Sequence, residues 1–513
     1  MLILHPTIYL DSAGAATDAL LLRDGKVVAV GDSARQAAGA EDKRVRPDGV
    51  CVMPALADAH IHLYGLGLRA GTVDLRGLDA DDALTAMADA EAQTEGWIFG
   101  TNLDDNQFSP DQRVTRADLD RLFPDNPVCI HRVDRHAVWA NTAALERARF
   151  DEVYTPSAEG RAQRDADGEL TGLLVDAAME PLLSTIPEPG QAETRAVFGE
   201  SIAMLHAFGI GFCTIARSEV RHLGMVQTAV QNGEIPVALD VLVDGMDRDL
   251  DAILEAGPVV DHERGFRMAG IKFFSDGALG SAGAHLLEPY RQGGLGLPIH
   301  DEGFLRRRIP ELMTLGWQVA VHAIGDAANR RVLDAFEEVP AQVRRQLRPR
   351  IEHAQMVTAK DCPRFAELTV IASIQPIHLR SDAPWAPQRL SEAQLERLFP
   401  WRDLLPTPLA AGSDYPIDDP NPWHGIATAL TRQGYDGEPF RPEQALTRQE
   451  IIAAYTSGAA FASHREAQFG ALHPGFHATA IVVDVDPFQA PAEDIWDAKA
   501  THLNTSSTHR DHL

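Results

Sequence analysis

Histidines and one aspartate stand at the ends of separate apolar, strand-like runs in the sequence. The first run ends in His60 and His62, and later runs end in His322, His353 and Asp414. Because alternate residues of a strand face the same side, the imidazoles of His60 and His62 can reach one point. Each residue alone is more often structural, but several imidazoles with a carboxylate are typical ligands of Zn²⁺. Together these residues predict a metal site.

Eight apolar runs alternate with amphipathic, helix-like segments from residue 53 onward. This alternation is typical of βα units and predicts an α/β fold, a (β/α)8 TIM barrel. Active sites of such barrels lie at the carboxyl ends of the strands, where the candidate ligands stand. Two capping-box patterns, Ser391–Gln394 and Thr447–Glu450, mark helix starts, and Asp326 is a candidate N-cap. The predicted strands are Val52–His62, Gly211–Ile215, Pro236–Val243, Met268–Phe274, Trp317–His322, Arg350–His353, Val370–Gln375 and Leu409–Asp414.

Both ends of the chain and one long insertion depart from this alternation. Short strand-like runs near both termini, with a hairpin turn predicted at Asp24-Gly25, favour a small sheet built from both ends. About 140 residues separate the first two barrel strands, which is too long for a loop and predicts an inserted domain. The expected domains are a small β-sandwich of residues 1–52 and 466–498, a barrel of residues 53–64 and 202–465, an inserted α+β domain of residues 65–201 over the barrel mouth, and a disordered tail of residues 499–513.

The overall charge limits the partners of the protein. Its 513 residues include 46 Lys and Arg against 74 Asp and Glu, a formal net charge of −28. Such a chain is repelled by nucleic acids and anionic membranes, so we expect neither as a partner. No run approaches the length of about eighteen apolar residues that indicates a membrane span, and the start lacks the basic region of a signal peptide. Four dispersed cysteines without a CxxC motif favour a soluble, cytoplasmic protein.

Lysine is scarce, and one lysine therefore stands out. The chain uses arginine for every cation except five, which are Lys26, Lys43, Lys272, Lys360 and Lys499. Coding bias explains most single lysines in such a chain. A lysine can also be retained where the chemistry needs an amine, which the guanidinium group of arginine cannot replace. Lys272 lies in the fourth predicted barrel strand, and the candidate ligands lie in other strands of the same predicted barrel.

These motifs resemble the amidohydrolase superfamily of metal-dependent barrel hydrolases. The segment Met53–His62 is similar to the strand-one signature of that superfamily. The long insertion, Arg132–His136 within it, and the segments Ile271–Ser281 and Val321–Asp326 resemble the branch of N-substituted formamide deformylase. The likeness covers nearly the whole chain and implies a β-sandwich from both termini beside the barrel. The second strand, Gly211–Arg217, departs from this branch because it lacks the usual His-Asp pair.

The resemblance implies a site with two divalent metal ions, expected to be Zn²⁺. Lys272, carboxylated by CO₂, and a hydroxide would bridge the two ions. Asp414 would take the proton of the hydroxide as it attacks and deliver it to the leaving nitrogen. The ligands implied are His60, His62 and Asp414 for the more buried ion, and His322 and His353 for the more exposed one.

A site with one metal ion is the alternative. In that case His60, His62, His322 and Asp414 hold the ion, and His353 is a catalytic residue that orients the substrate or stabilises the oxyanion. Lys272 would then form an ion pair instead of a carbamate.

We therefore expect hydrolysis of a C–N bond in a small-molecule amide or N-acyl compound by attack of a metal-activated hydroxide. Two alternatives stay open: a mononuclear deaminase of the same superfamily, and a non-catalytic member that only binds its ligand. Family likeness also suggests a homodimer. Further residues expected to contact the substrate are His136, Asp276, Gln375, His378 and Trp385.

Overall fold

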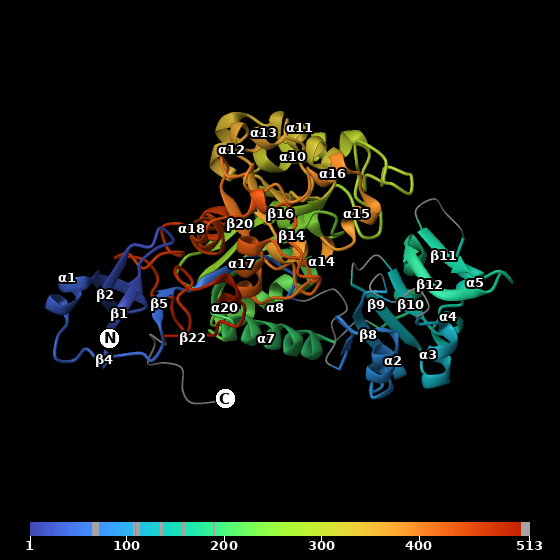
Figure 1. The fold of residues 1–513 in the computed structure, drawn as a ribbon, viewed down its shortest axis with the longest axis horizontal. Coiled ribbons are helices and arrows are strands. Elements are labelled where there is room, and N and C mark those ends of the chain that lie inside the picture. The colour runs from blue at the N-terminus through green and yellow to red at the C-terminus, as the bar shows by residue number, and fades with distance from the viewer. Residues whose placement is uncertain are drawn as a thin grey trace. The chain divides into compact units, whose positions relative to one another are not determined.

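The computed structural model describes residues 1–63, 71–105, 108, 113–133, 137–155, 160–187 and 190–503. The chain forms two compact units, one of Met1–Leu63 with Glu200–Leu513 and the other of Tyr64–Gly199 (Figure 1). The first unit contains the barrel and the sheet made from both chain ends. No helix in the part of the chain that the structure describes is long and apolar enough to cross a membrane.

The first unit is built around a nearly closed barrel of parallel strands. Within the described residues, eight parallel strands follow one another in chain order around it, which confirms the predicted TIM barrel. Their side chains are almost all buried, as expected for parallel strands covered by helices. The strands are β6 (Leu56–Ile61), β13 (Ile210–Ser218), β14 (Ala238–Asp244), β16 (Phe266–Phe274), β17 (Gln318–Ala323), β18 (Arg350–His353), β19 (Ile371–Ile374) and β20 (Leu409–Ala411).

Helices cover this barrel, and some of them begin at capping residues. Ser391 and Thr447 each complete a capping box, as the sequence predicts. Asp326 is not an N-cap, because Gly325 takes that position and the Asp326 carboxylate is used elsewhere. The helices are α8 (Val220–Gln231), α9 (Leu250–Ala256), α10 (Glu302–Thr314), α11 (Asp326–Glu337), α12 (Ala341–Leu347), α13 (Cys362–Glu367), α14 (Pro376–Asp382), α15 (Ala386–Arg389), α16 (Glu392–Leu395), α17 (Pro422–Thr431), α18 (Arg448–Ala453) and α19 (Ala459–Ala462).

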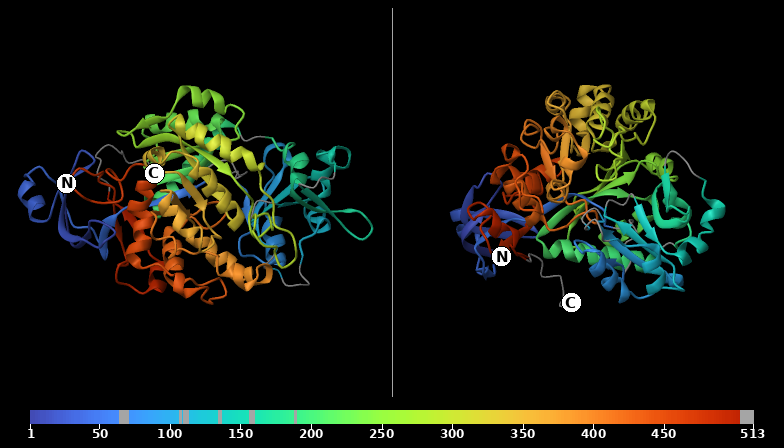
Figure 2. Two further views of the ribbon diagram at one scale, coloured as in Figure 1. Left: turned by 90° about the horizontal axis from the view of Figure 1, so that it is seen from above. Right: turned by 45° about the vertical axis from the view of Figure 1, so that its right-hand side comes forward.

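The two chain ends meet in one sheet, visible as blue strands next to red segments (Figure 2). Asp24 and Gly25 both have positive φ, 48° and 69°, which is the hairpin geometry predicted for this turn. Over the described residues the order is β22-β21-β5-β1-β2-β3, with β4 beside β1. Its strands are β1 (Leu2–Tyr9), β2 (Ala16–Arg23), β3 (Lys26–Val30), β4 (Arg44–Val45), β5 (Cys51–Pro54), β21 (Ala480–Val483) and β22 (Ala500–His502), and the helices α1 (Gly31–Ala37) and α20 (Ala492–Trp496) accompany them.

Two sequence expectations about this sheet need correction. The predicted strand Val52–His62 is two strands: β5 pairs with β21 in the terminal sheet, and β6 begins the barrel after Ala55. The sequence predicts a disordered tail from residue 499, but β22 pairs antiparallel with β21. The backbone groups of β22 find hydrogen-bond partners in β21, although the polar sequence of the tail gives no sign of a strand. Residues 504–513 lie outside the described part of the chain.

The second unit has its own sheet and its own apolar core. The sheet order, within the described residues, is β11-β12-β10-β9-β8-β7. Buried side chains such as Trp97, Phe150 and Leu174 form one cluster of its core. Its elements are β7 (Val73–Asp74), α2 (Ala80–Ala88), β8 (Ile98–Leu103), α3 (Arg116–Leu122), β9 (Val128–Arg132), β10 (Ala137–Ala140), α4 (Thr142–Arg147), α5 (Phe150–Val153), β11 (Gly160–Arg164), β12 (Leu170–Asp176) and α6 (Glu180–Leu183).

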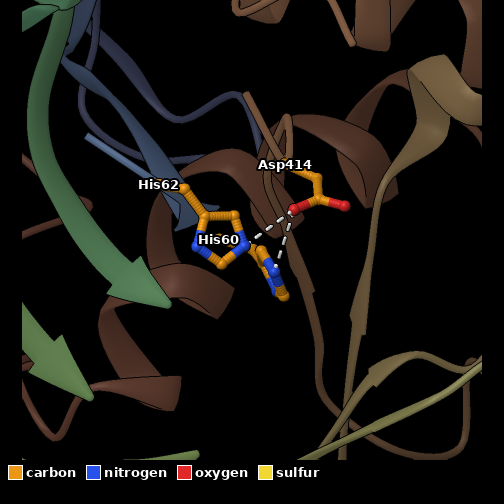
Figure 3. Close-up of side chains that lie close together, drawn as sticks. All are labelled: His60, His62 and Asp414. Atoms are coloured by element: carbon orange, nitrogen blue, oxygen red, sulfur yellow. Dashed lines mark ion pairs between the residues drawn. The ribbon is translucent and has the colours of Figure 1, made fainter. Parts of the chain in front are cut away.

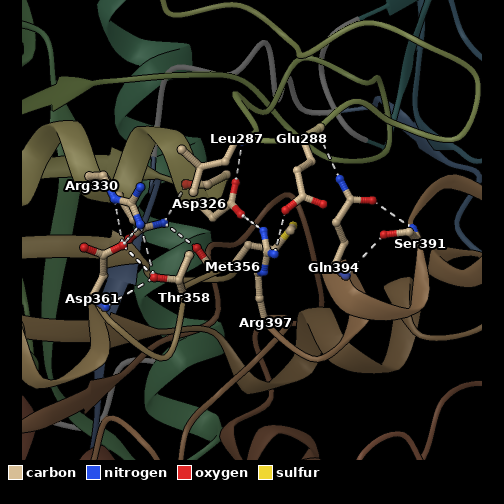
Figure 4. A network of polar contacts seen from close by, with 12 residues as sticks. Leu287, Glu288, Asp326, Arg330, Met356, Thr358, Asp361, Ser391, Gln394 and Arg397 are labelled. Carbon is tan, nitrogen blue, oxygen red and sulfur yellow. Dashed lines mark hydrogen bonds and ion pairs between the residues drawn. The ribbon is translucent and has the colours of Figure 1, made fainter.

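A polar network fastens the long segment of residues 275–301, which follows β16 at the carboxyl end of the barrel (Figure 4). The buried Asp326 carboxylate accepts hydrogen bonds from the Leu287 amide at 2.8 Å and from Arg397 Nη1 at 2.7 Å. Arg397 also binds Glu288 Oε1 at 2.9 Å, and Gln394 Nε2 donates to the Glu288 carbonyl at 2.9 Å. The segment after the fourth barrel strand is therefore tied to α11 and to the region of α16.

Replacing Asp326 by alanine tests how much this network stabilises the barrel. The Leu287 amide and the Arg397 guanidinium would lose a buried acceptor, so we expect destabilisation of about 1–3 kcal/mol. The matched control is Glu392→Ala, because the Glu392 side chain is 88% exposed and lies 3.6 Å from Arg291. That control should change stability by less than about 0.5 kcal/mol. Equal thermal unfolding midpoints for the two variants would contradict the assignment.

Candidate metal centre

His60, His62 and Asp414 converge at the place where the first and last barrel strands meet (Figure 3). His60 lies in β6 and His62 directly follows it, and their Nε2 atoms lie 3.2 Å and 3.1 Å from Asp414 Oδ1. All three residues are buried. Their ligand atoms lie within 4.8 Å of one another, which is compact enough for one metal ion.

A second group of ligand atoms shares the same carboxylate. His353 ends β18 and His378 lies in the first turn of α14, and with Asp414 they offer ligand atoms within 4.8 Å of one another. His378 Nε2 lies 3.8 Å from Asp414 Oδ2. His353 and Asp414 have φ angles of 74° and 60°, a left-handed conformation that is strained for residues other than glycine. Such strain is typical of functional sites, where it directs side chains into the site.

Lys272 lies near this site and is fully buried in β16. Its Nζ has no hydrogen-bond partner among the described residues and sits 4.3 Å from the centroid of the Phe274 ring. Burial lowers the pKa of Lys272 to about 8, against the opposing effect of the Glu352 and Asp414 carboxylates. A larger share of this amine is therefore neutral near pH 8 than for an exposed lysine.

His322 lies beside His353, with ring centroids 4.5 Å apart. Its Nε2 faces the carbonyl of Gly277 at 3.5 Å and Asp276 Oδ1 at 3.6 Å. Within the described chain, His322 does not join either compact group of ligand atoms. It nevertheless lies at the same end of the barrel, because it occupies the penultimate position of β17.

The donor set fits a divalent metal ion. Besides Lys272 Nζ, the buried atoms His353 Nδ1 and His378 Nε2 have no hydrogen-bond partner among the described residues. Each such buried atom costs about 1–3 kcal/mol unless a ligand satisfies it. Burial lowers the pKa of His62 to about 4, so this imidazole is neutral and its lone pair can bind a metal.

The charge around His60 also suits a cation. Burial opposes protonation of His60, but the Asp414 and Glu352 carboxylates outweigh this effect and raise the pKa of the imidazole. Burial would likewise raise the pKa of Asp414, yet the surrounding histidines hold it well below its usual range. The carboxylate is thus ionised, and a bound cation would take the place of a proton between these groups.

The other predicted substrate contacts occupy different environments. Asp276 is fully buried, and its carboxylate accepts from the amides of Ile324 at 3.0 Å, Gly325 at 2.8 Å and His285 at 2.8 Å. Gln375 is the buried N-cap residue of α14, three positions before His378. Trp385 is half-buried, with the Arg389 guanidinium 5.5 Å above its ring. His136 lies outside the described residues.

Sequence reasoning missed a carboxylate that contacts a candidate ligand directly. Glu352 Oε2 lies 2.6 Å from His60 Nδ1, and Arg350 binds the other oxygen of Glu352 at 2.8 Å. All three side chains are fully buried. The available signal was the pair of charged residues in Arg350-Ile351-Glu352-His353, an unusual composition for a strand that is buried on both faces.

One known protein family matches this chain along most of its length. The model described as the amidohydrolase family matches residues 48–504, nearly the whole chain. The chain belongs to the amidohydrolase family. The superfamily resemblance noted in the sequence is thereby confirmed, and metal-dependent hydrolysis is the general chemistry that it indicates.

Individual relatives of this amidohydrolase agree with the family assignment. The chain is 32% identical to YtcJ of Bacillus subtilis, covering 96% of each protein. It is 25% identical to the N-substituted formamide deformylase of Arthrobacter pascens, covering 93% of this chain and 92% of that protein. Among solved structures, an uncharacterised metal-dependent hydrolase from Pyrococcus horikoshii OT3 is similar, with a TM-score of 0.79, 27% identity, and coverage of 96% of this chain and 99% of that one.

Proposed function

We propose that this amidohydrolase cleaves a C–N bond in a small-molecule amide or N-acyl compound. The observation that carries the proposal is the convergence of four histidines on one buried carboxylate, Asp414, at the carboxyl end of the barrel. The likeness to an N-substituted formamide deformylase supports a C–N bond as the target. The half-buried Trp385 and His378 Nε2, which has no hydrogen-bond partner among the described residues, are suited to contact a substrate of this kind.

We propose two divalent metal ions, with Zn²⁺ preferred by the imidazole-rich donor set. His60, His62 and Asp414 would hold one ion. His322 and His353 would hold the other, with Lys272 as a shared ligand after its Nζ attacks CO₂, forms an N–C bond and releases a proton. The fully buried Nζ supports this step, because it has no hydrogen-bond partner in the described part of the chain and a carbamate would replace the amine by two oxygen ligands.

Asp414 is the proposed proton carrier of the reaction. A bound divalent cation supplies Lewis-acid chemistry, polarising the scissile carbonyl group and acidifying water. Asp414 accepts a proton from the attacking water and delivers it to the leaving nitrogen, so that amide and water become acid and amine. His378, 3.8 Å from Asp414 Oδ2, would hydrogen-bond the substrate on the same side. Asp276 would shape the substrate site through the backbone amides that its carboxylate binds, Gln375 would line that site, and His136 is a further proposed contact.

A mononuclear deaminase is the second candidate. The observation that favours it is that His60, His62 and Asp414 by themselves complete a compact ligand group. In that enzyme Lys272 would stay an amine, and His353 would orient the substrate or stabilise its oxyanion.

The reaction class can be tested with metal-loaded protein and a panel of N-formyl amines, N-acyl amino acids, cyclic amides and amidine-like heterocycles. Release of an amine and an acid from an amide is the expected result. Release of ammonia from the heterocycles alone would support the deaminase instead. If no compound of any class is hydrolysed by protein with a full metal complement, the proposal fails.

Asp414→Asn should abolish turnover while metal stays largely bound. The amide keeps an oxygen ligand but cannot carry the proton, and general acid–base catalysis contributes about 100- to 10,000-fold to the rate. Asp361→Asn is a matched control, because Asp361 is a buried carboxylate bonded to Arg330 and Thr358 outside the site (Figure 4). Turnover measured beside metal content separates the two effects, and near-normal activity of Asp414→Asn would rule out the role of Asp414 as base.

Lys272→Arg should cost the protein one of its two metal equivalents and most of its activity. Arginine keeps the charge but stays protonated, so it cannot react with CO₂. Lys499→Arg, at an exposed position, is the control and should retain both metal equivalents and full activity. Elemental analysis of the purified proteins measures the change, and a full metal complement with full activity in Lys272→Arg would favour the mononuclear site.

A further inference from the structure

A chain of charged, fully buried side chains crosses the barrel interior from β18 to the metal centre. Arg350 and Glu352 point to the same side of β18, and Glu352 reaches His60 in β6, which is not a neighbour of β18 in the sheet. The Glu352 Oε2 to His60 Nδ1 distance is 2.6 Å, typical of a charge-assisted hydrogen bond. This contact uses the imidazole nitrogen that faces away from Asp414.

The contact determines which nitrogen of His60 carries a proton. An ionised carboxylate can only accept a hydrogen bond, so the proton of the pair must lie on Nδ1. In the neutral, metal-binding form of the ring, the opposite nitrogen, Nε2, then carries the lone pair, on the side of Asp414 Oδ1, which lies 3.2 Å away. That nitrogen is the one that a metal ion at this site would bind.

Arg350 holds Glu352 in the geometry that this hydrogen bond needs. Its Nε donates to Oε1 at 2.8 Å and its Nη2 to Oε2 at 3.1 Å, so both carboxylate oxygens are fixed. The same Nη2 donates to the Ala59 carbonyl at 2.8 Å and approaches Ser373 Oγ at 3.1 Å. Arg350 therefore links β18 to β6 and β19 at the level of the residue that precedes His60.

A contribution to folding stability alone does not explain a buried ion pair of this kind. Taking both charges out of water costs several kcal/mol, and well-packed apolar residues often stabilise a core equally well. The Arg350–Glu352 pair contacts a candidate metal ligand, His60, and this contact suggests a specific role for the pair. Carboxylates that receive the second N–H of a metal-bound histidine are a general device for fixing the ring and its tautomer.

We propose that Glu352, held by Arg350, is a positioning residue that fixes the tautomer and orientation of His60 for metal binding. The inference rests on the proposed function only in that the centre binds a metal ion, and it is independent of the reaction and the substrate. Glu352 would act only through His60 and would contact neither the metal ion nor the substrate. Its loss should weaken metal binding by about 10- to 100-fold while the barrel stays folded.

The chain offers a matched control in a second buried ion pair of the same barrel. Arg267 Nη1 binds both oxygens of Asp240, at 2.8 Å and 3.0 Å, and both residues are buried. Asp240 lies in β14 and has no histidine bonded to it in the described structure. Asp240→Asn thus removes a buried charge of the barrel without touching the metal centre.

The test compares wild-type, Glu352→Gln and Asp240→Asn proteins after metal removal and titration with Zn²⁺ or Co²⁺ against a competing chelator. We expect a 10- to 100-fold rise in the metal Kd and an altered Co²⁺ absorption spectrum for Glu352→Gln. Asp240→Asn should lower the thermal unfolding midpoint but leave the Kd and the spectrum unchanged. An unchanged Kd and spectrum for Glu352→Gln, or equal shifts in both variants, would overturn the proposal.

A measurement on the wild-type protein covers the case in which Glu352→Gln does not fold. Two-bond ¹H–¹⁵N spectra of the histidine side chains report the tautomer of each ring in the Zn²⁺-loaded protein. The His60 signals, assigned by their loss in His60→Gln, should show the proton on Nδ1, and a proton on Nε2 would overturn the proposal. Neither experiment measures turnover, so a negative substrate panel on metal-binding protein would reject the proposed reaction and leave this inference standing.

Discussion

The barrel closes at the seam between β6 and β20, and this closure also assembles the metal centre. Along the described chain these two strands share no regular ladder. Instead, the Asp414 amide donates to the His60 carbonyl and the His62 amide donates to the Tyr415 carbonyl, both at 2.8 Å. The same two backbone bonds that join the first and last strands place the Asp414 carboxylate against both imidazoles. Moving the backbone of Asp414 away from His60 and His62 would therefore break the hydrogen bonds at this seam.

The interior around this seam concentrates charges that compensate one another. Asp58 lies two residues before His60 in β6. Its carboxylate accepts hydrogen bonds from Ser413 Oγ at 2.6 Å and from the His60 amide at 2.9 Å. Burial raises the pKa of Asp58 to about 6, against the effect of these hydrogen bonds. Burial would also raise the pKa of Glu352, but the Arg350 guanidinium and His60 outweigh it and lower the pKa. Each of these charges around His60 has a partner placed by the strands, which offsets the cost of burying it.

The sequence predicts the barrel well because the signals of its strands are local. Apolar runs, capping boxes at Ser391 and Thr447, and the Asp24-Gly25 turn all depend on near neighbours. The split of Val52–His62 could not be read this way, since β5 and β6 are both apolar and only their distant partners differ. The contact of Glu352 with His60 spans 292 residues of sequence, so no local pattern reveals it. The placement of His378 beside Asp414 depends on a helix, whose residues lie outside the strand periodicity used to find the ligands.

Lys272 and Arg350 are two buried basic residues of the same region that differ in their hydrogen-bond partners. Both are fully buried in barrel strands. The guanidinium of Arg350 binds Glu352, the Ala59 carbonyl and Ser373, so its role as a structural cation is clear. The amine of Lys272 has no hydrogen-bond partner in the described residues, although burying an unpaired ammonium is costly. Since this chain uses arginine for nearly every other cation, a lysine at this position agrees with the reactive amine proposed for Lys272.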